Sequence, residues 1–358
     1  MFTQRTPTTR YSIGMKWRPV TIYLVLFLVL ILTAFVALTV GSANLNLGKV
    51  IRIITGTLGL TRPVGYTSLE QKIISDLRLP RIILAALVGG ALSIAGVVFQ
   101  GLFRNPMADP YIIGTSSGAA LGAALGFVSG LDIQIFNLNV VPALAFTGAI
   151  GTTIVVYNLS RVGSKISMMV LLLTGVAFSF LLSSITSVIM ILRRDETHNI
   201  ITWMIGGFTA SRWVHVKVIL PYLIVGMALL VAFSRDLDLM LLGEEKAHQL
   251  GVNIQRLQGI LTLAASLLVA AAVSFSGIIG FVGLVVPHMV RLIIGPNHKQ
   301  LLPIATLTGA IFLLIADTVA RIVLSPLELP VGIITAFLGA PFFIYLLRRN
   351  KLAGESKL

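Results

Sequence analysis

The sequence predicts an all-α membrane protein with about ten transmembrane helices, folded as one domain over residues 1–358. Composition is the first observation, because 56% of the residues are hydrophobic, 11% are charged and the mean hydropathy is +0.96. A spanning helix takes about 20 apolar residues, so this composition has room for about ten spans. The second observation is that the apolar residues form long runs, which short polar segments separate.

The first apolar run, residues 21–40, follows a basic segment without acidic residues. It is about 20 residues long, whereas the apolar core of a signal peptide has about 7–15, so we expect a first span. The membrane-spanning core is expected over residues 20–348. The other expected spans are 82–103, 112–130, 138–158, 168–192, 214–234, 255–275, 277–293, 300–322 and 331–348.

The positions of Lys and Arg predict the orientation. Ten spans place both termini on one side, and about 16 of the 27 basic residues fall on that side. We therefore expect a multi-pass protein of the cytoplasmic (inner) membrane with both termini in the cytoplasm. The opposite face holds residues 41–81, whose surplus of positive charge favours an acidic partner. Its basic residues are Lys49, Arg52, Arg62, Lys72, Arg78 and Arg81.

One long polar interruption, residues 234–259, separates two apolar runs on the expected cytoplasmic side. It contains a short helical pattern, EEKAHQLG, that ends at Gly251. Leu241, Leu242, Ala247 and Leu250 give this helix an apolar side. We expect residues 234–255 to dock into another protein, and a solvated helix without a partner is the alternative.

Glycine recurs every fourth residue in GTSSGAALGAALG, at Gly114, Gly118, Gly122 and Gly126. Such a ridge lets another helix backbone approach closely, so we expect a packing role, with pathway lining as a secondary possibility. The same stretch matches the G-x-S-x-G motif of hydrolases. That motif needs a strand-to-helix turn in an α/β sheet, so we reject it for a membrane span.

Asp317 and Arg321 are charged residues in the apolar run LLIADTVARIVL. A lone charge at the bilayer centre costs about 2.5–3.5 kcal/mol, so pairing or a shallow position is required. The acid precedes the base by four residues, which is the favourable order for an ion pair on a helix. A proton relay would need further intramembrane acids, so a structural pair is the better interpretation.

Several functions are excluded by missing patterns. The chain has no cysteine, no G-x-x-x-x-G-K-[ST] and no H-E-x-x-H, and its five histidines are scattered. We therefore expect no cofactor, no metal site and no catalytic residue in this chain. The net charge of +14 does not indicate nucleic acid, because basic loops of a multispan protein face anionic lipid.

Five stretches together resemble one family of transport proteins. They are LRLPR (77–81), QGLFRNPMADPYIIGTSSGA (100–119), GEEKAHQLGV (243–252), SGIIGFVGLVVPHMVRLIIGPNHKQLLP (276–303) and ADTVARIVLSPLELPVGIITAFLGAPFFIYLL (316–347). They resemble the permease subunits of binding-protein-dependent ABC importers for iron siderophores, haem and vitamin B12. The resemblance covers almost the whole chain from residue 77 onward.

The resemblance implies a type II ABC importer permease fold. It implies a homodimer around a central pathway that the fifth and tenth spans border, although pairing with a related permease stays open. Two ATP-binding subunits would hold the ATP and Mg, and their coupling would involve Gly243, Glu244, Glu245, Ala247, Leu250 and Gly251. An extracytoplasmic substrate-binding protein would dock on Arg78, Arg81 and Arg321. Residues 198–208 look like the short helix that follows the fifth span in this family.

The expected cargo is a ferric siderophore, with haem and cobalamin as further candidates. An ion-coupled secondary transporter is the alternative function. Such transporters usually show internal repeats and coupling acids in broken helices. No convincing repeat is present here, and Asp317 is the only strong intramembrane acid. An intramembrane enzyme is a third class, for which a pair of nucleophile and base is missing.

Overall fold

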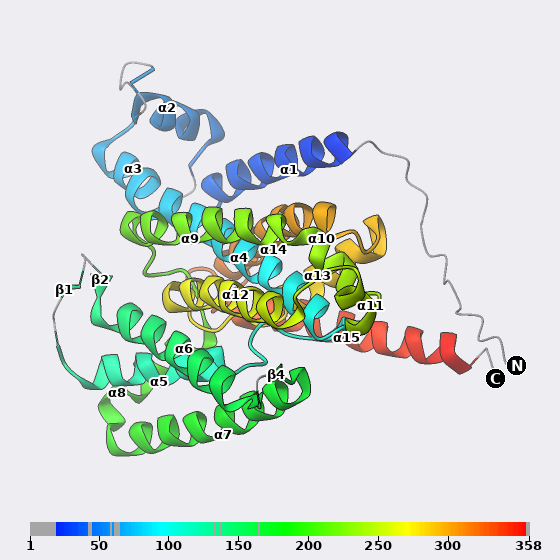
Figure 1. Cartoon of the computed structure of the whole chain (residues 1–358). Helices are drawn as coiled ribbons and strands as arrows, with labels where there is room; N and C mark the ends of the chain where they lie inside the picture. The colour runs from blue at the N-terminus through cyan, green and yellow to red at the C-terminus, as the bar shows by residue number, and fades with distance from the viewer. Residues whose placement is uncertain are drawn as a thin grey trace, which may run out of the picture.

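The computed structural model describes residues 19–41, 45–57, 59–60, 65–131, 134–135, 138–163 and 165–355. Helices form all of the regular structure in these residues apart from two hairpins of two-residue strands, and loops connect them (Figure 1). The basic segment 1–18 and Arg62, which entered the charge argument, lie outside the described residues.

Ten apolar helices correspond in order to the ten expected spans. They are α1 (Pro19–Thr39), α4 (Leu79–Leu102), α5 (Thr115–Val128), α6 (Val140–Leu159), α7 (Met168–Leu192), α9 (Trp213–Ala232), α12 (Ile254–Ser276), α13 (Val282–Ile294), α14 (His298–Ile322) and α15 (Val331–Glu355).

Short elements connect these helices. The helical ones are α2 (Leu47–Thr57), α3 (Ser68–Lys72), the π-helix η1 (Ile73–Arg78), α8 (Arg194–Ile205), α10 (Ser234–Met240) and α11 (Glu244–Gln249). The strands pair antiparallel as β1 (Gln134–Ile135) with β2 (Leu138–Asn139), and β3 (Arg161–Val162) with β4 (Lys165–Ile166).

Two of the expected spans contain a helix that is too short to cross a bilayer. Helices α5 and α13 have 14 and 13 residues, which at 1.5 Å per residue is about 20 Å against a core of about 30 Å. A residue with positive φ precedes each of them, Gly114 at 85° and Phe281 at 67°. Pro110 contacts Gly283, so the chain before α5 folds back against the start of α13.

Helix α4 forms the centre of the bundle. Its apolar stretch is 83% buried, and α9, α12, α13 and α14 pack around it. Backbones approach closely at small residues. A Cβ atom on Gly89 would overlap the carbonyl of Gly309 on α14, and one on Gly96 would overlap that of Gly283 on α13. Close approach of this kind stabilises helix pairs in a membrane.

The glycine ridge lies against α6. A Cβ atom on Gly118 would overlap Thr152 and the carbonyl of Gly148, and one on Gly122 would overlap the carbonyl of Leu144. Gly126 faces Val141 in the same way. Gly114 differs, because it is the residue before the first turn of α5. Its backbone has a positive φ, and the helix begins after it.

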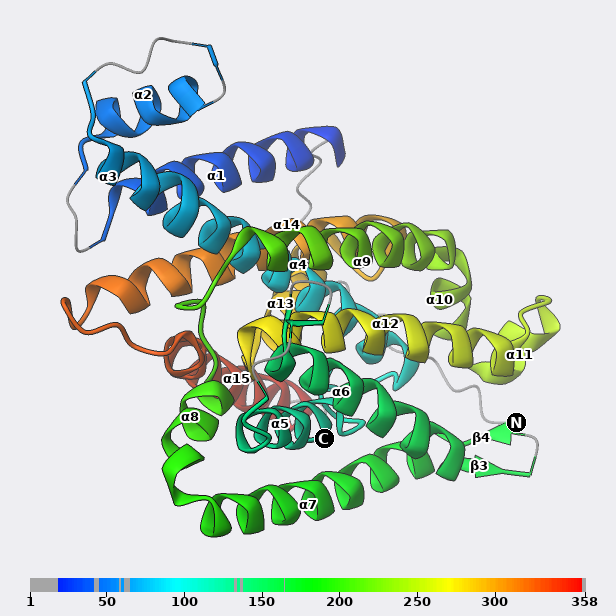
Figure 2. The ribbon, with the colours of Figure 1, turned by 90° about the vertical axis from the view of Figure 1, so that its left-hand side faces the viewer.

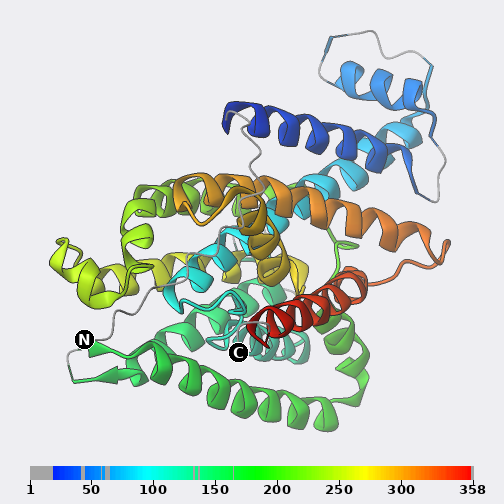
Figure 3. The same ribbon diagram turned by 90° about the vertical axis from the view of Figure 1, so that its right-hand side faces the viewer.

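The connecting segments gather at two ends of the bundle. Helices α10 and α11 and the β3–β4 hairpin lie at one end, and α2, α3 and the α14–α15 loop lie at the other (Figures 2 and 3). Helix α1 begins and α15 ends on the side of α11 (Figure 1). This is the grouping of loops that the charge distribution predicts for a cytoplasmic and an outer face.

Candidate functional site

The polar interruption folds as two short helices, α10 and α11, where the sequence pattern indicated one. Gly243, with φ of 104°, stands between them, and Gly251, with φ of 89°, follows α11. Both backbone conformations favour glycine, which explains these residues at the two bends. Ala247 is completely buried, so it anchors α11 to the bundle and is not available to a partner.

Helix α10 is fastened to the first turn of α14. Asp238 Oδ1 accepts hydrogen bonds from the backbone N–H of His298 at 2.9 Å and from its ring Nδ1 at 2.6 Å. Burial opposes ionisation of Asp238, but the hydrogen bonds from His298 prevail and lower its pKa. The carboxylate also lies at the N-terminus of α14, where the helix dipole favours negative charge.

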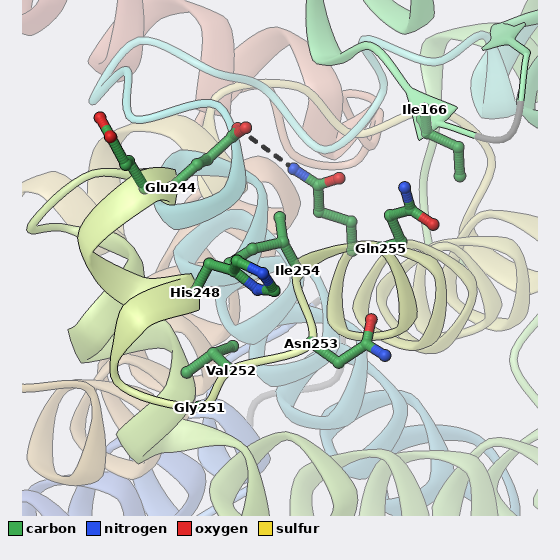
Figure 4. A pocket seen from close by; sticks show the side chains of 10 residues that line it. Ile166, Glu244, His248, Gly251, Val252, Asn253, Ile254 and Gln255 are labelled. Carbon is green, nitrogen blue, oxygen red and sulfur yellow. Dashed lines mark hydrogen bonds between the residues drawn. The ribbon is translucent and has the colours of Figure 1, made fainter.

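Helix α11 is held through Glu244. Its Oε1 atom accepts a hydrogen bond from Gln258 Nε2 at 3.3 Å and lies 3.5 Å from Arg104 Nη2. These partners belong to α12 and to the loop after α4. Figure 4 shows the contact between Glu244 and α12 across the opening.

The outer surface of this segment is partly apolar. Leu241, Leu242 and Leu250 expose 41%, 56% and 57% of their surface. The sequence pattern predicted that these leucines share an apolar side with Ala247, but only Ala247 is buried. Exposed leucines in the turns on both sides of a short helix that carries Glu245 are typical of a protein contact surface.

A cleft of about 560 Å³ lies between α11, the start of α12 and the β3–β4 hairpin (Figure 4). Its walls are polar and apolar in similar measure, and it contains no group of residues suited to a metal. In the described part of the chain, no three His, Asp or Glu side chains are placed to hold a metal ion. The lining residues are Ile166, Glu244, Glu245, His248, Gly251, Val252, Asn253, Ile254, Gln255 and Gln258.

Two of the three arginines at the opposite end bind the C-terminus of α1. Arg78 donates to the carbonyl of Leu38 at 2.6 Å. Arg321 donates to the carbonyls of Ala37 at 3.1 Å and Val40 at 3.2 Å. Carbonyl groups of a last helical turn have no partner within the helix, and cationic side chains also suit the negative end of its dipole.

Asp317 is the buried acid of this cluster. It pairs with Arg81 at 2.8 Å and with Arg321, four residues later, at 3.3 Å. The expected helical pair is therefore confirmed, and Arg81 is a second partner that the sequence did not indicate. Arg81 also pairs with Glu328 at 2.7 Å, which lies in the loop before α15.

The structure brings Arg78, Arg81 and Arg321 together at one end, as expected, but it does not expose them. Their exposed fractions are 7%, 9% and 6%. The α1 carbonyls and Asp317 bind these buried guanidinium groups. Their contact with a substrate-binding protein stays a prediction.

Sequence reasoning missed several residues that contact the α10–α11 segment or the three outer arginines. Asp238, His298, Arg104 and Gln258 fasten the two short helices, and Glu328 completes the arginine cluster. The partners lie up to 247 residues apart. No periodic pattern links such pairs, so only the fold could show them.

Comparison with known proteins gives the family. The sequence profile of the FecCD transport family matches residues 26–349. This chain belongs to the FecCD transport family. Among its relatives is the cobalamin import system permease protein BtuC of Halobacterium salinarum, 47% identical over 289 residues, which are 80% of this chain and 76% of the relative.

Two further FecCD relatives have other cargos in their names. The Fe(3+) dicitrate transport system permease protein FecD of Escherichia coli is 41% identical over 78% of this chain and 86% of its own. The hemin transport system permease protein HmuU of Yersinia pestis is 39% identical over 91% of this chain and 96% of its own.

The FecCD fold is also found among solved structures. One structure, described as an inward-facing conformation of a metal-chelate type ABC transporter, superposes with a TM-score of 0.79. It is 33% identical and covers 93% of this chain and all of that chain. The expected ABC importer permease fold is therefore confirmed.

Proposed function

We propose that this chain is the permease subunit of an ABC importer and that α10 and α11 form its contact with an ATP-binding subunit. The surface around α11 carries the proposal, because Glu245 of α11 and the exposed leucines that precede and follow this helix lie at one end of an otherwise apolar bundle. A chain with this surface and no P-loop is a non-catalytic membrane subunit, and the ATP and Mg belong to the partner.

The assembly we propose is a homodimer with two ATP-binding subunits on the cytoplasmic face and a binding protein on the outer face. Membership of the FecCD transport family supports the ATP-binding and substrate-binding partners of this assembly. Helix α15 would face the pathway together with α7. In the cytoplasmic membrane, this arrangement places both termini in the cytoplasm.

The cargo we propose is a metal chelate. Names of relatives include cobalamin, ferric dicitrate and haemin, and a molybdate import permease of Haemophilus influenzae is 34% identical over 93% of this chain. The first three names support a metal chelate, with a ferric siderophore, haem and cobalamin as candidates, whereas molybdate is an oxyanion and lies outside this class. The visible spectrum of the ligand retained by the cognate binding protein distinguishes these three.

Ion-coupled transport is not favoured. Coupling by a proton or cation needs an intramembrane acid that can bind it. Asp317 lies between Arg81 and Arg321 and is completely buried, so its charge is already compensated.

The proposed docking surface is tested by replacing Glu245 and Leu242. Glu244 is unsuitable, because it holds α11 through Gln258 and Arg104. The double variant Glu245→Lys/Leu242→Asp changes only exposed side chains. We expect normal insertion and melting temperature, but loss of binding of the ATP-binding subunit and of ATP-driven uptake in proteoliposomes.

The matched control is Lys72→Glu on the opposite end, where the side chain is equally exposed. It reverses a charge without touching α10 or α11, so binding of the ATP-binding subunit should be unchanged. Wild-type binding by the Glu245→Lys/Leu242→Asp variant would contradict the docking assignment.

A further inference from the structure

A second pocket lies beside the cleft of α11. It encloses about 430 Å³ between the end of α6, the β3–β4 hairpin and the first turn of α12. Ile166 and Gln255 line both spaces, so the two form one continuous surface. Figure 4 shows these two side chains on the wall that faces α11. The second pocket is lined by Tyr157, Arg161, Gly163, Ile166, Gln255 and Arg256.

The two pockets differ in charge. The cleft carries Glu244 and Glu245, whereas the second pocket carries Arg161 and Arg256 and no acid. Both arginines are exposed, and neither forms an ion pair with any residue that the structure describes.

The Arg161 guanidinium lies over the ring of Tyr157, with 5.7 Å between its carbon and the ring centroid. Stacking on an aromatic face orients a guanidinium and leaves its in-plane N–H donors available. The pocket therefore presents an oriented cation next to a second one, which suits a carboxylate.

We propose that the ATP-binding subunit also occupies this second pocket and places an acidic side chain between Arg161 and Arg256. This inference rests on the proposed function, because the same partner would sit on α11. The partner would then place a basic group in the acidic cleft of α11 and an acidic group in the basic second pocket. Such alternation of charge fixes the orientation of a partner and excludes others.

The headgroup of an anionic lipid is the other possible occupant of two arginines at a membrane surface. Continuity with the α11 cleft, beside three exposed leucines outside the bundle, favours the protein partner. The experiment uses nanodiscs of pure phosphatidylcholine, in which no anionic lipid is present.

Affinity of the ATP-binding subunit would be measured for Arg161→Glu/Arg256→Glu and for the control Lys299→Glu/Arg348→Glu, whose residues lie outside α10 and α11. The control side chains are exposed at the same end, line neither pocket and change the net charge equally. We expect the pocket variant to bind about tenfold more weakly and the control to change less than about twofold. High salt should reduce the difference.

A labelling experiment gives an independent readout, because the chain contains no cysteine. The ATP-binding subunit should protect Arg161→Cys from a maleimide and leave Arg348→Cys, on α15, reactive. Equal affinity of the wild type and the pocket variant, or equal loss in the control, would overturn the proposal.

Lipid binding is recognised separately. If the pocket variant keeps its affinity but retains less anionic lipid on purification, the pocket is a headgroup site and the proposal is wrong. The Glu245→Lys/Leu242→Asp variant shows whether only the second-pocket proposal is wrong or the proposed function is wrong as well. If only the Glu245→Lys/Leu242→Asp variant loses binding, α11 is the docking helix and the second pocket takes no part in docking. If both this variant and Arg161→Glu/Arg256→Glu bind as the wild type does, the proposed function and the second-pocket proposal are both wrong.

Discussion

Asp317 is the acid on which the buried charge cluster depends, and its replacement gives the first prediction. Removing one partner of a buried ion pair leaves an uncompensated charge and costs about 3–5 kcal/mol. Asp317→Asn leaves Arg321 without its anion and leaves Arg81 with only the partly exposed Glu328. We therefore expect the variant to melt at a clearly lower temperature in detergent.

Glu328→Gln is the control, because Glu328 also pairs with Arg81 but exposes 39% of its side chain. An exposed pair contributes at most about 1 kcal/mol, so this variant should melt close to the wild type. Similar melting temperatures for both variants would show that the cluster adds little to stability.

The contact of Asp238 with His298 gives a prediction with a pH dependence. Asp238→Ala removes an acceptor of two hydrogen bonds. We expect a loss of about 1–2 kcal/mol, because the carboxylate is only partly buried. Asp238→Asn keeps an oxygen acceptor and should retain most of the stability.

The sign of the pH effect follows from the lowered pKa of Asp238. A carboxyl group whose pKa is lowered by folding stabilises the protein above its ordinary pKa, here 3.8. This contribution is lost as the pH falls through the lower pKa of the folded state. The difference in stability between wild type and Asp238→Ala should be constant above about pH 5 and shrink in stronger acid. A difference that disappears near neutral pH would contradict this account.

The contact of α5 with α6 is tested by adding a single methyl group. A Cβ atom on Gly122 would overlap the carbonyl of Leu144, so Gly122→Ala must separate the two backbones. We expect a loss of about 1–3 kcal/mol, as for other overpacked sites. The measurement is thermal unfolding in detergent.

Gly151→Ala on α6 is the matched control, since nothing lies within 4 Å of a Cβ atom there. Alanine has the higher helix propensity, so this variant should be as stable as the wild type or slightly more stable. If Gly122→Ala is equally harmless, the two helices do not pack closely in the membrane.

The orientation of the whole molecule can be checked with single cysteines in this cysteine-free chain. Leu60, 72% exposed, follows α2 at the expected outer end, and Lys246 lies on α11 at the expected cytoplasmic end. We expect a membrane-impermeant maleimide to label Leu60→Cys in intact cells and to label Lys246→Cys only after permeabilisation. The reverse pattern would invert the topology.

Much of the architecture could be predicted without the fold. All ten apolar helices were located within a few residues, because burial in lipid demands a continuous apolar run. The lengths of α5 and α13 were exceptions, and α15 continues to Glu355, beyond the expected end at residue 348. Apolar residues continue before Thr115 and Val282, and the sequence does not reveal that positive φ angles interrupt the helix there.

The sequence by itself determined the membrane class, the grouping of loops at two ends, the family and the position of the polar segment that folds as α10 and α11. These are properties of composition, periodicity and local motifs. Only the tertiary structure decided which charges are free and which are paired. Arg81 meets Asp317 across 236 residues of sequence, and Arg78 reaches the end of α1. Burial and pairing depend on contacts between distant segments, which is why the sequence could not show that the three outer arginines are buried or that Arg161 and Arg256 line one pocket.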